Sequence, residues 1–374
     1  MRNVMSLIKV ILINILITFS LLGMLLIAPP VIYSVYSIIS VNSSSSSPTD
    51  ERYELALYKN VPWAESHFVE LSQTQTTYYD FITWRRNDYH GETINIIDGV
   101  RATIGSQAQI NDTTQYFFFG GSTTWGTGVN DANTYPSLFA QQTNTRAQNF
   151  GESSYIARQS LAYLNNLIIQ ESKNDWSESH VVFYDGVNDV GNGCRTEISG
   201  FGTSREQQIQ NALQSAFDKK YSFTKSFEQL TEFLSAVKRK LENSKLIAET
   251  YYNCHLDPER AEEVARTLVE TWQAAYDLVT QQGGDFTAIL QPVAYLGNPN
   301  IDYLELTTNN DLALAKQYEA VYPLIKQLAK TRNINFLDLT STYDNCDNCY
   351  IDHSHVGPEA HQLLVEDLAR NLLR

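Results

Sequence analysis

Basic residues are scarce in this chain of 374 residues. Its 27 lysines and arginines stand against 42 aspartates and glutamates, which gives a formal net charge of -15, and no stretch concentrates the basic residues. Such a chain repels a phosphate backbone rather than releasing its counterions. We therefore expect no nucleic-acid partner.

The chain also lacks internal repeats with a period of about 20 to 50 residues, which argues against a solenoid or propeller. Apolar residues, in contrast, are plentiful: they make up 43% of the chain and include 22 tyrosines, 16 phenylalanines and 5 tryptophans. This composition excludes wholesale disorder. The length suits one large domain with accessory segments.

Charge is absent from Val10 to Thr49, and Val10–Pro29 is a run of mostly apolar residues. At a rise of about 1.5 Å per residue, a helix of that length crosses a hydrocarbon core of about 30 Å. We expect residues 1–41 to form an N-terminal membrane anchor. A cleaved signal peptide is the competing interpretation, but the apolar run exceeds the usual length of about 7 to 15 residues and no A-x-A-like site follows it.

The flanking charges predict the orientation of this segment. Arg2 and Lys9 precede it, and Asp50 and Glu51 are the first charges after it. The positive-inside rule then places the N-terminus in the cytoplasm. The rest of a single-pass chain would lie in the periplasm or at the cell surface.

Only four cysteines are present, Cys194, Cys254, Cys346 and Cys349. They form an even set in a compartment that permits disulfides, and three pairings are possible. A redox motif or half a zinc site at the single C-x-x-C lacks a βαβ context or a second C-x-x-C. We prefer structural bridges and leave their pairing open.

The segments after the anchor differ in composition. The serine run that ends at Pro48 predicts a linker over residues 42–60. Residues 61–112 contain aromatic and β-branched pieces with turn signals, which indicate an N-terminal extension packed on the main domain. Its Trp84, Arg85 and Arg86 can contact a substrate, but we favour packing and surface charge for them.

Residues 113–374 alternate between short apolar runs and longer stretches with helical spacing. The runs are "YFFFG", "RAQNFG", "HVVFYDG", "FTAILQPV" and "INFLDLT". This alternation predicts a parallel sheet covered by helices on both faces, with ligands bound at the carboxyl ends of the strands. Residues 204–243 are expected to be a helical insertion that borders the site or caps the sheet.

Three strand ends carry residues suited to catalysis. Ser122 follows two glycines, which let the chain turn sharply and leave the serine hydroxyl and N–H accessible. Gly151 allows a backbone N–H to approach a ligand closely, and Asn188 can direct its amide toward a developing negative charge. Each residue alone is also explained by ordinary capping or turn chemistry.

The C-terminal stretch "YIDHSHVGPEAH" adds an acid and an imidazole. Asp352 and His355 are three residues apart, a spacing that lets the carboxylate hold the ring while the ring faces a serine. His353 lacks this spacing, and His361 should lie inside the helix that begins near Pro358, so we expect structural roles for both. These residues do not define a metal site, because no further ligands accompany them.

Taken in order, "GGST", "NFG", "GVND" and "DHSH" resemble the four sequence blocks of the SGNH (GDSL) hydrolase superfamily, over about residues 115–374. The resemblance implies a three-layer α/β/α sandwich with a mostly parallel, flavodoxin-like sheet, here preceded by the transmembrane helix. The first block differs from G-D-S-L, because Gly121 and Thr123 stand where Asp and Leu are named.

The resemblance also implies roles. Ser122 would be the nucleophile, His355 the general base and then acid, and Asp352 the group that orients the imidazole. The backbone N–H groups of Ser122 and Gly151 and the side chain of Asn188 would form the oxyanion hole. A histidine suits proton transfer near neutral pH because its pKa is ordinarily about 6.5.

We therefore expect a serine esterase that needs no cofactor and removes an acyl group, most simply acetyl, from an extracytoplasmic carbohydrate or lipid-linked ester. An O-acyltransferase that uses the same residues on an exported polysaccharide is the first alternative, and it would require a separate membrane partner as acyl donor. A non-catalytic binding protein of the same fold is the second.

Overall fold

The computed structural model describes residues 12–18, 50–105, 114–170, 176–198, 202–217 and 251–373. The chain divides into two compact units, and the larger, Thr49–Gln208 with Ile247–Arg374, contains the central sheet. The smaller unit is Met1–Pro48 with Ile209–Leu246. Its described parts are the helical residues 12–18 and the C-terminal part of helix α7 (Ser204–Phe217).

Several predicted segments fall largely outside these ranges. Most of the expected membrane span Val10–Pro29 does so, as do residues 42–49 of the linker and 218–243 of the insertion. Within the described ranges, no helix has the length and apolar character needed to cross a membrane.

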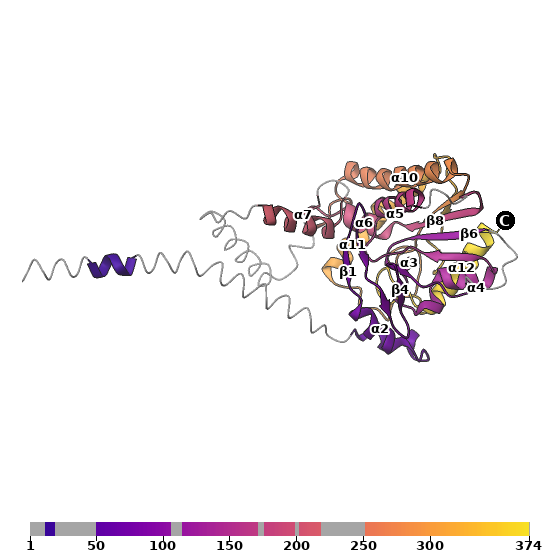
Figure 1. The fold of residues 1–374 in the computed structure, drawn as a ribbon, viewed down its shortest axis with the longest axis horizontal. Helices are drawn as coiled ribbons and strands as arrows, with labels where there is room; N and C mark the ends of the chain where they lie inside the picture. The colour runs from indigo at the N-terminus through magenta and orange to yellow at the C-terminus, as the bar shows by residue number, and fades with distance from the viewer. Residues whose placement is uncertain are drawn as a thin grey trace, which may run out of the picture. The chain divides into compact units, whose positions relative to one another are not determined.

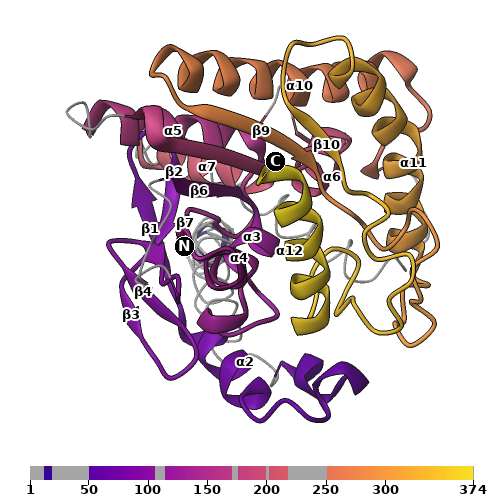
Figure 2. The same ribbon diagram turned by 90° about the vertical axis from the view of Figure 1, so that its right-hand side faces the viewer.

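An eight-stranded mixed sheet forms the centre of the larger unit (Figures 1 and 2). Its order is β10-β9-β8-β6-β7-β5-β4-β3. The strands are β3 (Tyr89–His90), β4 (Asn95–Ile97), β5 (Val100–Arg101), β6 (Gln115–Gly120), β7 (Arg146–Asn149), β8 (Ser179–Asp185), β9 (Asp285–Leu290) and β10 (Phe336–Asp338).

Strands β6 to β10 are parallel and correspond to the five apolar runs of the sequence. Numbered from β6, their order is 2-1-3-4-5, which is the flavodoxin-like order. Strand β8 is buried at every position, as expected for a strand covered on both faces. The predicted parallel sheet is therefore confirmed, and three antiparallel strands extend it at the β7 edge.

Helices cover both faces of the sheet, and Figure 2 shows the three layers. On one side, α5 (Ala157–Gln170) and α10 (Pro258–Gln281) pack on the strands, and α11 (Asn309–Ala329) packs against α10. On the other, α4 (Tyr135–Thr143) and α12 (Pro358–Leu372) pack together and share a core with β6 and β8.

The phenylalanines of β6 show how the strand joins these layers. Phe118 meets the ring of Tyr135 on α4 edge to face, with 5.3 Å between centroids. Phe119 points to the opposite layer and contacts Tyr163 of α5 edge to face at 5.9 Å. Alternation along the strand thus buries aromatic rings on both faces.

The N-terminal extension joins the sheet rather than only resting on it. It contains α2 (Ala64–Gln73), a separate hairpin of β1 (Thr76–Tyr79) and β2 (Thr83–Arg86), and strands β3 to β5. Strand β5 pairs with β7 through Arg101 and Asn149. The sheet of the main domain therefore continues into the N-terminal extension.

The linker predicted over residues 42–60 is wrong at its C-terminal end. Glu51–Glu54 (η1) and Ala56–Tyr58 (η2) form 3-10 helices, and the Asp50 side chain caps the first by accepting the Arg52 N–H. Tyr58 is buried, and its hydroxyl donates to the Gly128 carbonyl at 2.6 Å. Within this segment, Asp50 and Arg52 form an ion pair at 2.7 Å, so its N-terminal part is folded rather than a spacer.

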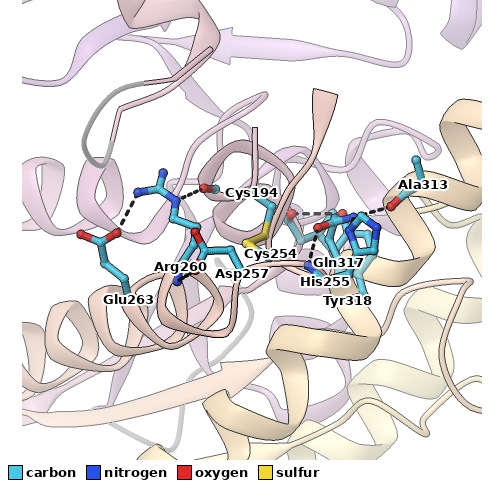
Figure 3. The surroundings of a disulfide bond; sticks show 11 residues. Cys194, Cys254, His255, Asp257, Arg260, Glu263, Ala313, Gln317 and Tyr318 are labelled. Carbon is cyan, nitrogen blue, oxygen red and sulfur yellow. Dashed lines mark hydrogen bonds and ion pairs between the residues drawn. A yellow bond between two sulfur atoms is a disulfide. The ribbon is translucent and has the colours of Figure 1, made fainter. Parts of the chain in front are cut away.

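Both pairs of cysteines form disulfides. Cys194 bonds to Cys254, so the bridge closes the base of the segment that contains the insertion (Figure 3). Cys194 directly follows helix α6 (Val187–Gly193). Beside the bridge, the Arg260 guanidinium donates to the Gly193 carbonyl at 2.8 Å. Cys346 bonds to Cys349, just before the loop that carries Asp352 and His355.

Candidate active site

The turn after β6 presents Ser122 at the carboxyl edge of the parallel strands. Gly120 has φ of +152°, a conformation that favours glycine, and a Cβ there would meet the Tyr184 carbonyl and the Thr124 side chain. Gly121 is the N-cap of the short helix α3 (Ser122–Trp125). The two glycines therefore allow a strand-to-helix turn too tight for larger residues.

Ser122, His355 and Asp352 form a continuous chain of hydrogen bonds. The Ser122 Oγ lies 2.7 Å from His355 Nε2, and His355 Nδ1 lies 2.6 Å from Asp352 Oδ2. Although Ser122 and His355 are 233 residues apart in the sequence, their side chains meet directly. The arrangement lets the imidazole take the serine proton while the carboxylate holds the ring.

The loop that carries the acid and the imidazole is closed at its base. Tyr350 and Val356 form an antiparallel bridge, and the Gly357 N–H donates to the Cys349 carbonyl at 2.8 Å. Thr123 Oγ1 donates to the Ser354 carbonyl at 3.2 Å and so ties this loop to the serine helix. The threonine that departs from the G-D-S-L pattern thus has a structural role.

The two oxygens of Asp352 have different partners. Oδ1 accepts the backbone N–H groups of Ser354 and His355 at 2.9 and 2.8 Å. Oδ2 accepts from His355 and also from Arg52 Nη1, at 3.3 Å. Burial alone would raise the pKa of Asp352, but the adjacent His355 ring and its backbone N–H hold that pKa well below its usual range. The carboxylate is therefore ionised at neutral pH.

Asn188 lies beside the serine turn on α6. Its Nδ2 donates to the Tyr155 carbonyl at 2.9 Å, and a Cβ on Gly121 would lie 2.5 Å from the same nitrogen. The start of α6 is held by Asp189, whose carboxylate accepts the N–H groups of Ala157 and Gly186 at 3.0 and 3.3 Å. An amide nitrogen carries two hydrogens, so one remains for a ligand at Ser122.

Gly151 does not have the free N–H that we predicted for an oxyanion donor. This N–H donates to the Asn149 side-chain oxygen at 3.0 Å. A Cβ at Gly151 would lie 2.7 Å from the Thr124 carbonyl carbon and still closer to the Trp125 nitrogen. A glycine is required here because the backbone passes close to α3. From the sequence alone, this packing could not be distinguished from a close approach to a ligand.

The turn that follows Gly151 contains a backbone N–H that sequence reasoning missed. Ser154 has φ of +65°, and its N–H has no hydrogen-bond partner among the described residues. The next residue, Tyr155, supplies the carbonyl that holds Asn188. A positive φ at a non-glycine residue is uncommon and often marks a functional turn. No residue pattern in the sequence signals this conformation.

Strand β2 fixes this turn from the outside. Trp84 Nε1 donates to the Ser153 carbonyl at 3.1 Å, and Arg86 forms an ion pair with Glu152 at 3.2 Å. The Arg86 backbone N–H also donates to Glu152 at 2.9 Å. Burial raises the pKa of Glu152, although Arg86 opposes this shift. Trp84, Arg85 and Arg86 are all buried, which agrees with the predicted packing role and contradicts the surface charge that we also expected for the arginines.

Two arginines of the extension contact helix α3, which begins at Ser122. The guanidinium groups of Arg86 and Arg101 lie 4.0 and 4.2 Å from the ring centroid of Trp125, three residues after Ser122. Arg101 is fully buried, pairs with Asp131 at 2.9 Å and donates to the Gly126 carbonyl at 2.7 Å. The extension therefore forms part of the frame of the site.

The two alternative histidines have other environments. His361 is buried in α12, where its Nδ1 accepts the Tyr135 N–H at 3.0 Å, and burial lowers its pKa to about 3. The His353 ring stacks on Tyr295 with 5.8 Å between centroids. No cluster of three or more metal-ligating side chains occurs in the part of the chain that the structure describes.

Comparisons with known proteins show what this chain is similar to. A model of the GDSL-like lipase/acylhydrolase family matches residues 116–368. No curated protein matches the chain. Among solved structures, a lipolytic protein of the G-D-S-L family from Veillonella parvula DSM 2008 is 12% identical, with a TM-score of 0.39, 70% of this chain covered and 99% of that chain.

A carbohydrate acetylesterase family member from Sinorhizobium meliloti is 13% identical, with a TM-score of 0.38 and coverage of 70% of this chain and 100% of that one. The family match alone spans more than half of the chain, and it includes every residue of the hydrogen-bonded chain at the site. This protein therefore belongs to the GDSL-like lipase/acylhydrolase family and is an ester-hydrolysing enzyme.

Proposed function

We propose that the protein is a serine esterase that removes a short acyl group, most simply acetyl, from a carbohydrate ester outside the cytoplasm. The observation that carries this proposal is the chain of hydrogen bonds from Ser122 through His355 to Asp352. An unassisted serine hydroxyl is a poor nucleophile at neutral pH, and this chain supplies the base that it needs.

In the first half of the reaction, Ser122 Oγ attacks the acyl carbon as its proton moves to His355 Nε2. The tetrahedral intermediate then collapses, the bond to the alcohol oxygen breaks, and Nε2 returns the proton to that oxygen. In the second half, water gives a proton to Nε2 as its oxygen attacks the acyl carbon. The bond from that carbon to Ser122 Oγ then breaks, the acid leaves, and Nε2 returns the proton to Oγ. Asp352 stabilises the imidazolium in both halves.

The oxyanion would be bound by three donors. We assign the Ser122 N–H, one hydrogen of Asn188 Nδ2 and the N–H of Ser154, in place of Gly151, whose N–H is occupied by Asn149. The support for Ser154 is its positive φ, its N–H without a partner among the described residues, and its position next to the Tyr155 carbonyl that orients Asn188.

The proposed location rests on two features. Both cysteine pairs are joined as disulfides, which persist in oxidising compartments outside the cytoplasm. The uncharged stretch Val10–Thr49, with Arg2 and Lys9 before it, suits an N-terminal anchor that leaves the enzyme domain on the outer side. The preference for a carbohydrate rests on this location.

The test compares the full-length wild type with Ser122→Ala on 4-nitrophenyl acetate and on an acetylated polysaccharide. Ser72→Ala is the matched control, since this exposed hydroxyl only donates to the Val69 carbonyl. We expect Ser122→Ala to lower kcat by roughly 10⁴-fold or more and Ser72→Ala to leave it unchanged.

Two results would change the proposal. Equal rates for wild type and Ser122→Ala would refute the serine esterase mechanism. Transfer of acetyl from the ester to added glycan, with little release of acetate, would instead favour the O-acyltransferase alternative with the same residues.

A further inference from the structure

We propose that Arg52 is a positioning residue for the triad of Ser122, His355 and Asp352. Arg52 shares Asp352 Oδ2 with His355 and, together with Asp50, sets the pH range over which Ser122 is activated. This inference rests on the proposed esterase function. Arg52 lies in the folded end of the segment predicted as a linker, 300 residues from Asp352 in the sequence.

The contact is to the oxygen that matters for catalysis. Arg52 Nη1 lies 3.3 Å from Asp352 Oδ2, and His355 Nδ1 lies 2.6 Å from that same oxygen. A cation at this oxygen draws negative charge away from the imidazole and disfavours its protonated form. Arg52 therefore favours the neutral ring that can accept the serine proton.

Asp50 limits this effect. Its carboxylate binds the Arg52 guanidinium in a bidentate manner, with Nε to Oδ1 at 2.9 Å and Nη2 to Oδ2 at 2.7 Å. The pair raises the pKa of Arg52 despite its burial and lowers the pKa of Asp50 despite its own. Asp50 thus cancels much of the positive charge that Asp352 experiences, and it also fixes the direction of the guanidinium.

Packing holds the Asp50–Arg52 pair against residues 350–357, the loop that carries Asp352 and His355 and that we call the triad loop. The Arg52 guanidinium lies over the Phe68 ring at 5.1 Å from its centroid. Phe68 belongs to a small core with Tyr58 and Ile351, and Ile351 directly precedes Asp352. A Cβ at Gly357, at the end of the triad loop, would overlap the Leu57 side chain. Residues 50–58 therefore pack directly against the loop of Asp352 and His355 and do not act as a spacer.

Other titratable groups face this carboxylate, and they are either neutral or unchanged by the tests below. His353 lies on the same loop, where burial lowers its pKa, and Asp311 acts on His353 from α11. The phenols that interact electrostatically with Asp352 have pKa values raised by burial, so they are neutral: Tyr58, Tyr295 and Tyr318.

The experiment measures the rate at which a fluorophosphonate labels Ser122 in the full-length protein, as a function of pH, alongside kcat/KM for 4-nitrophenyl acetate. Removing the cation with Arg52→Met should move the acid-side midpoint of both profiles up by about half a pH unit. Removing the counter-charge with Asp50→Asn should move it down by a similar amount. Arg52→Lys, which retains the charge, should largely restore the wild-type midpoint.

Arg370→Met is the matched control. It removes the same charge from an arginine whose side chain is 64% exposed and pairs with Asp367 on α12, so its midpoint should equal that of the wild type. Merely structural damage would lower rates at every pH without moving the two midpoints in opposite directions.

Unchanged midpoints, or shifts of the same sign in Arg52→Met and Asp50→Asn, would overturn the role of Arg52. Labelling that depends on Ser122 without turnover of the acetyl ester would refute the proposed substrate, while the labelling profile would still decide the role of Arg52. A wild type that is neither labelled nor active would overturn both proposals.

Discussion

Replacing Asn188 with alanine tests whether this side chain is a transition-state donor or only a helix-surface residue. Its Nδ2 is held by the Tyr155 carbonyl at 2.9 Å and lies against Gly121, next to Ser122. In Asn188→Ala, the oxyanion would lose one of its three proposed donors. The loss of such a donor lowers kcat by about 10² to 10³-fold, or about 2.7–4 kcal/mol of barrier.

The effect on stability should be much smaller. Asn188 is only half-buried, and the variant loses one hydrogen bond, to the Tyr155 carbonyl. A hydrogen bond of this kind contributes about 1 kcal/mol to the free energy of unfolding. We therefore expect kcat for 4-nitrophenyl acetate to fall by at least 10²-fold, with KM nearly unchanged and an unfolding free energy lower by about 1 kcal/mol in urea.

Asn192→Ala is the control, because Asn192 lies one turn further along α6 and donates to the Asn188 carbonyl at 2.9 Å. It should change stability by a similar amount and leave kcat within a few-fold of the wild type. A kcat for Asn188→Ala within tenfold of the wild-type value would refute the reasoning, since one tenfold step corresponds to only about 1.4 kcal/mol.

Two further substitutions test the frame of the site. Gly121→Ala should push the Asn188 amide away, since the new Cβ would lie 2.5 Å from Nδ2. We expect kcat to fall by about 10²-fold with little change in the melting temperature. An unaltered kcat would contradict this. His361→Gln should be less destabilising, relative to wild type, at pH 5.5 than at pH 7.5, because burial lowers the pKa of His361 to about 3. The unfolded state, with a pKa of about 6.5, binds the extra proton, so the wild type loses about 1.4 kcal/mol over this interval that the variant does not. Equal differences in unfolding free energy at the two pH values would refute it.

Local patterns in the sequence were sufficient for the parallel sheet. The apolar runs that became β6 to β10 are recognisable because strands covered on both faces must be continuously apolar. Two short-range patterns were also recognisable in the sequence: the glycine pair before Ser122 and the three-residue spacing of Asp352 and His355.

Distant partners that belong to no recognised motif could not be predicted. The end of the linker was misjudged because the charges of Asp50 and Arg52 find each other and Asp352 only in the folded chain. The pairing of the four cysteines depended in the same way on which loops approach one another. A single sequence contains no signal for either.

The sequence by itself determined the order of the strands along the chain, because that order follows from periodicity. Its resemblance to the SGNH (GDSL) hydrolases implied the class of chemistry and the residues that meet at Ser122. Only the tertiary structure decided that Gly151 donates to Asn149, that the Ser154 turn lies beside Asn188, and that Arg52 reaches the triad. The direction of a backbone N–H and the partner of a charge are set by packing across hundreds of residues, which no local pattern records.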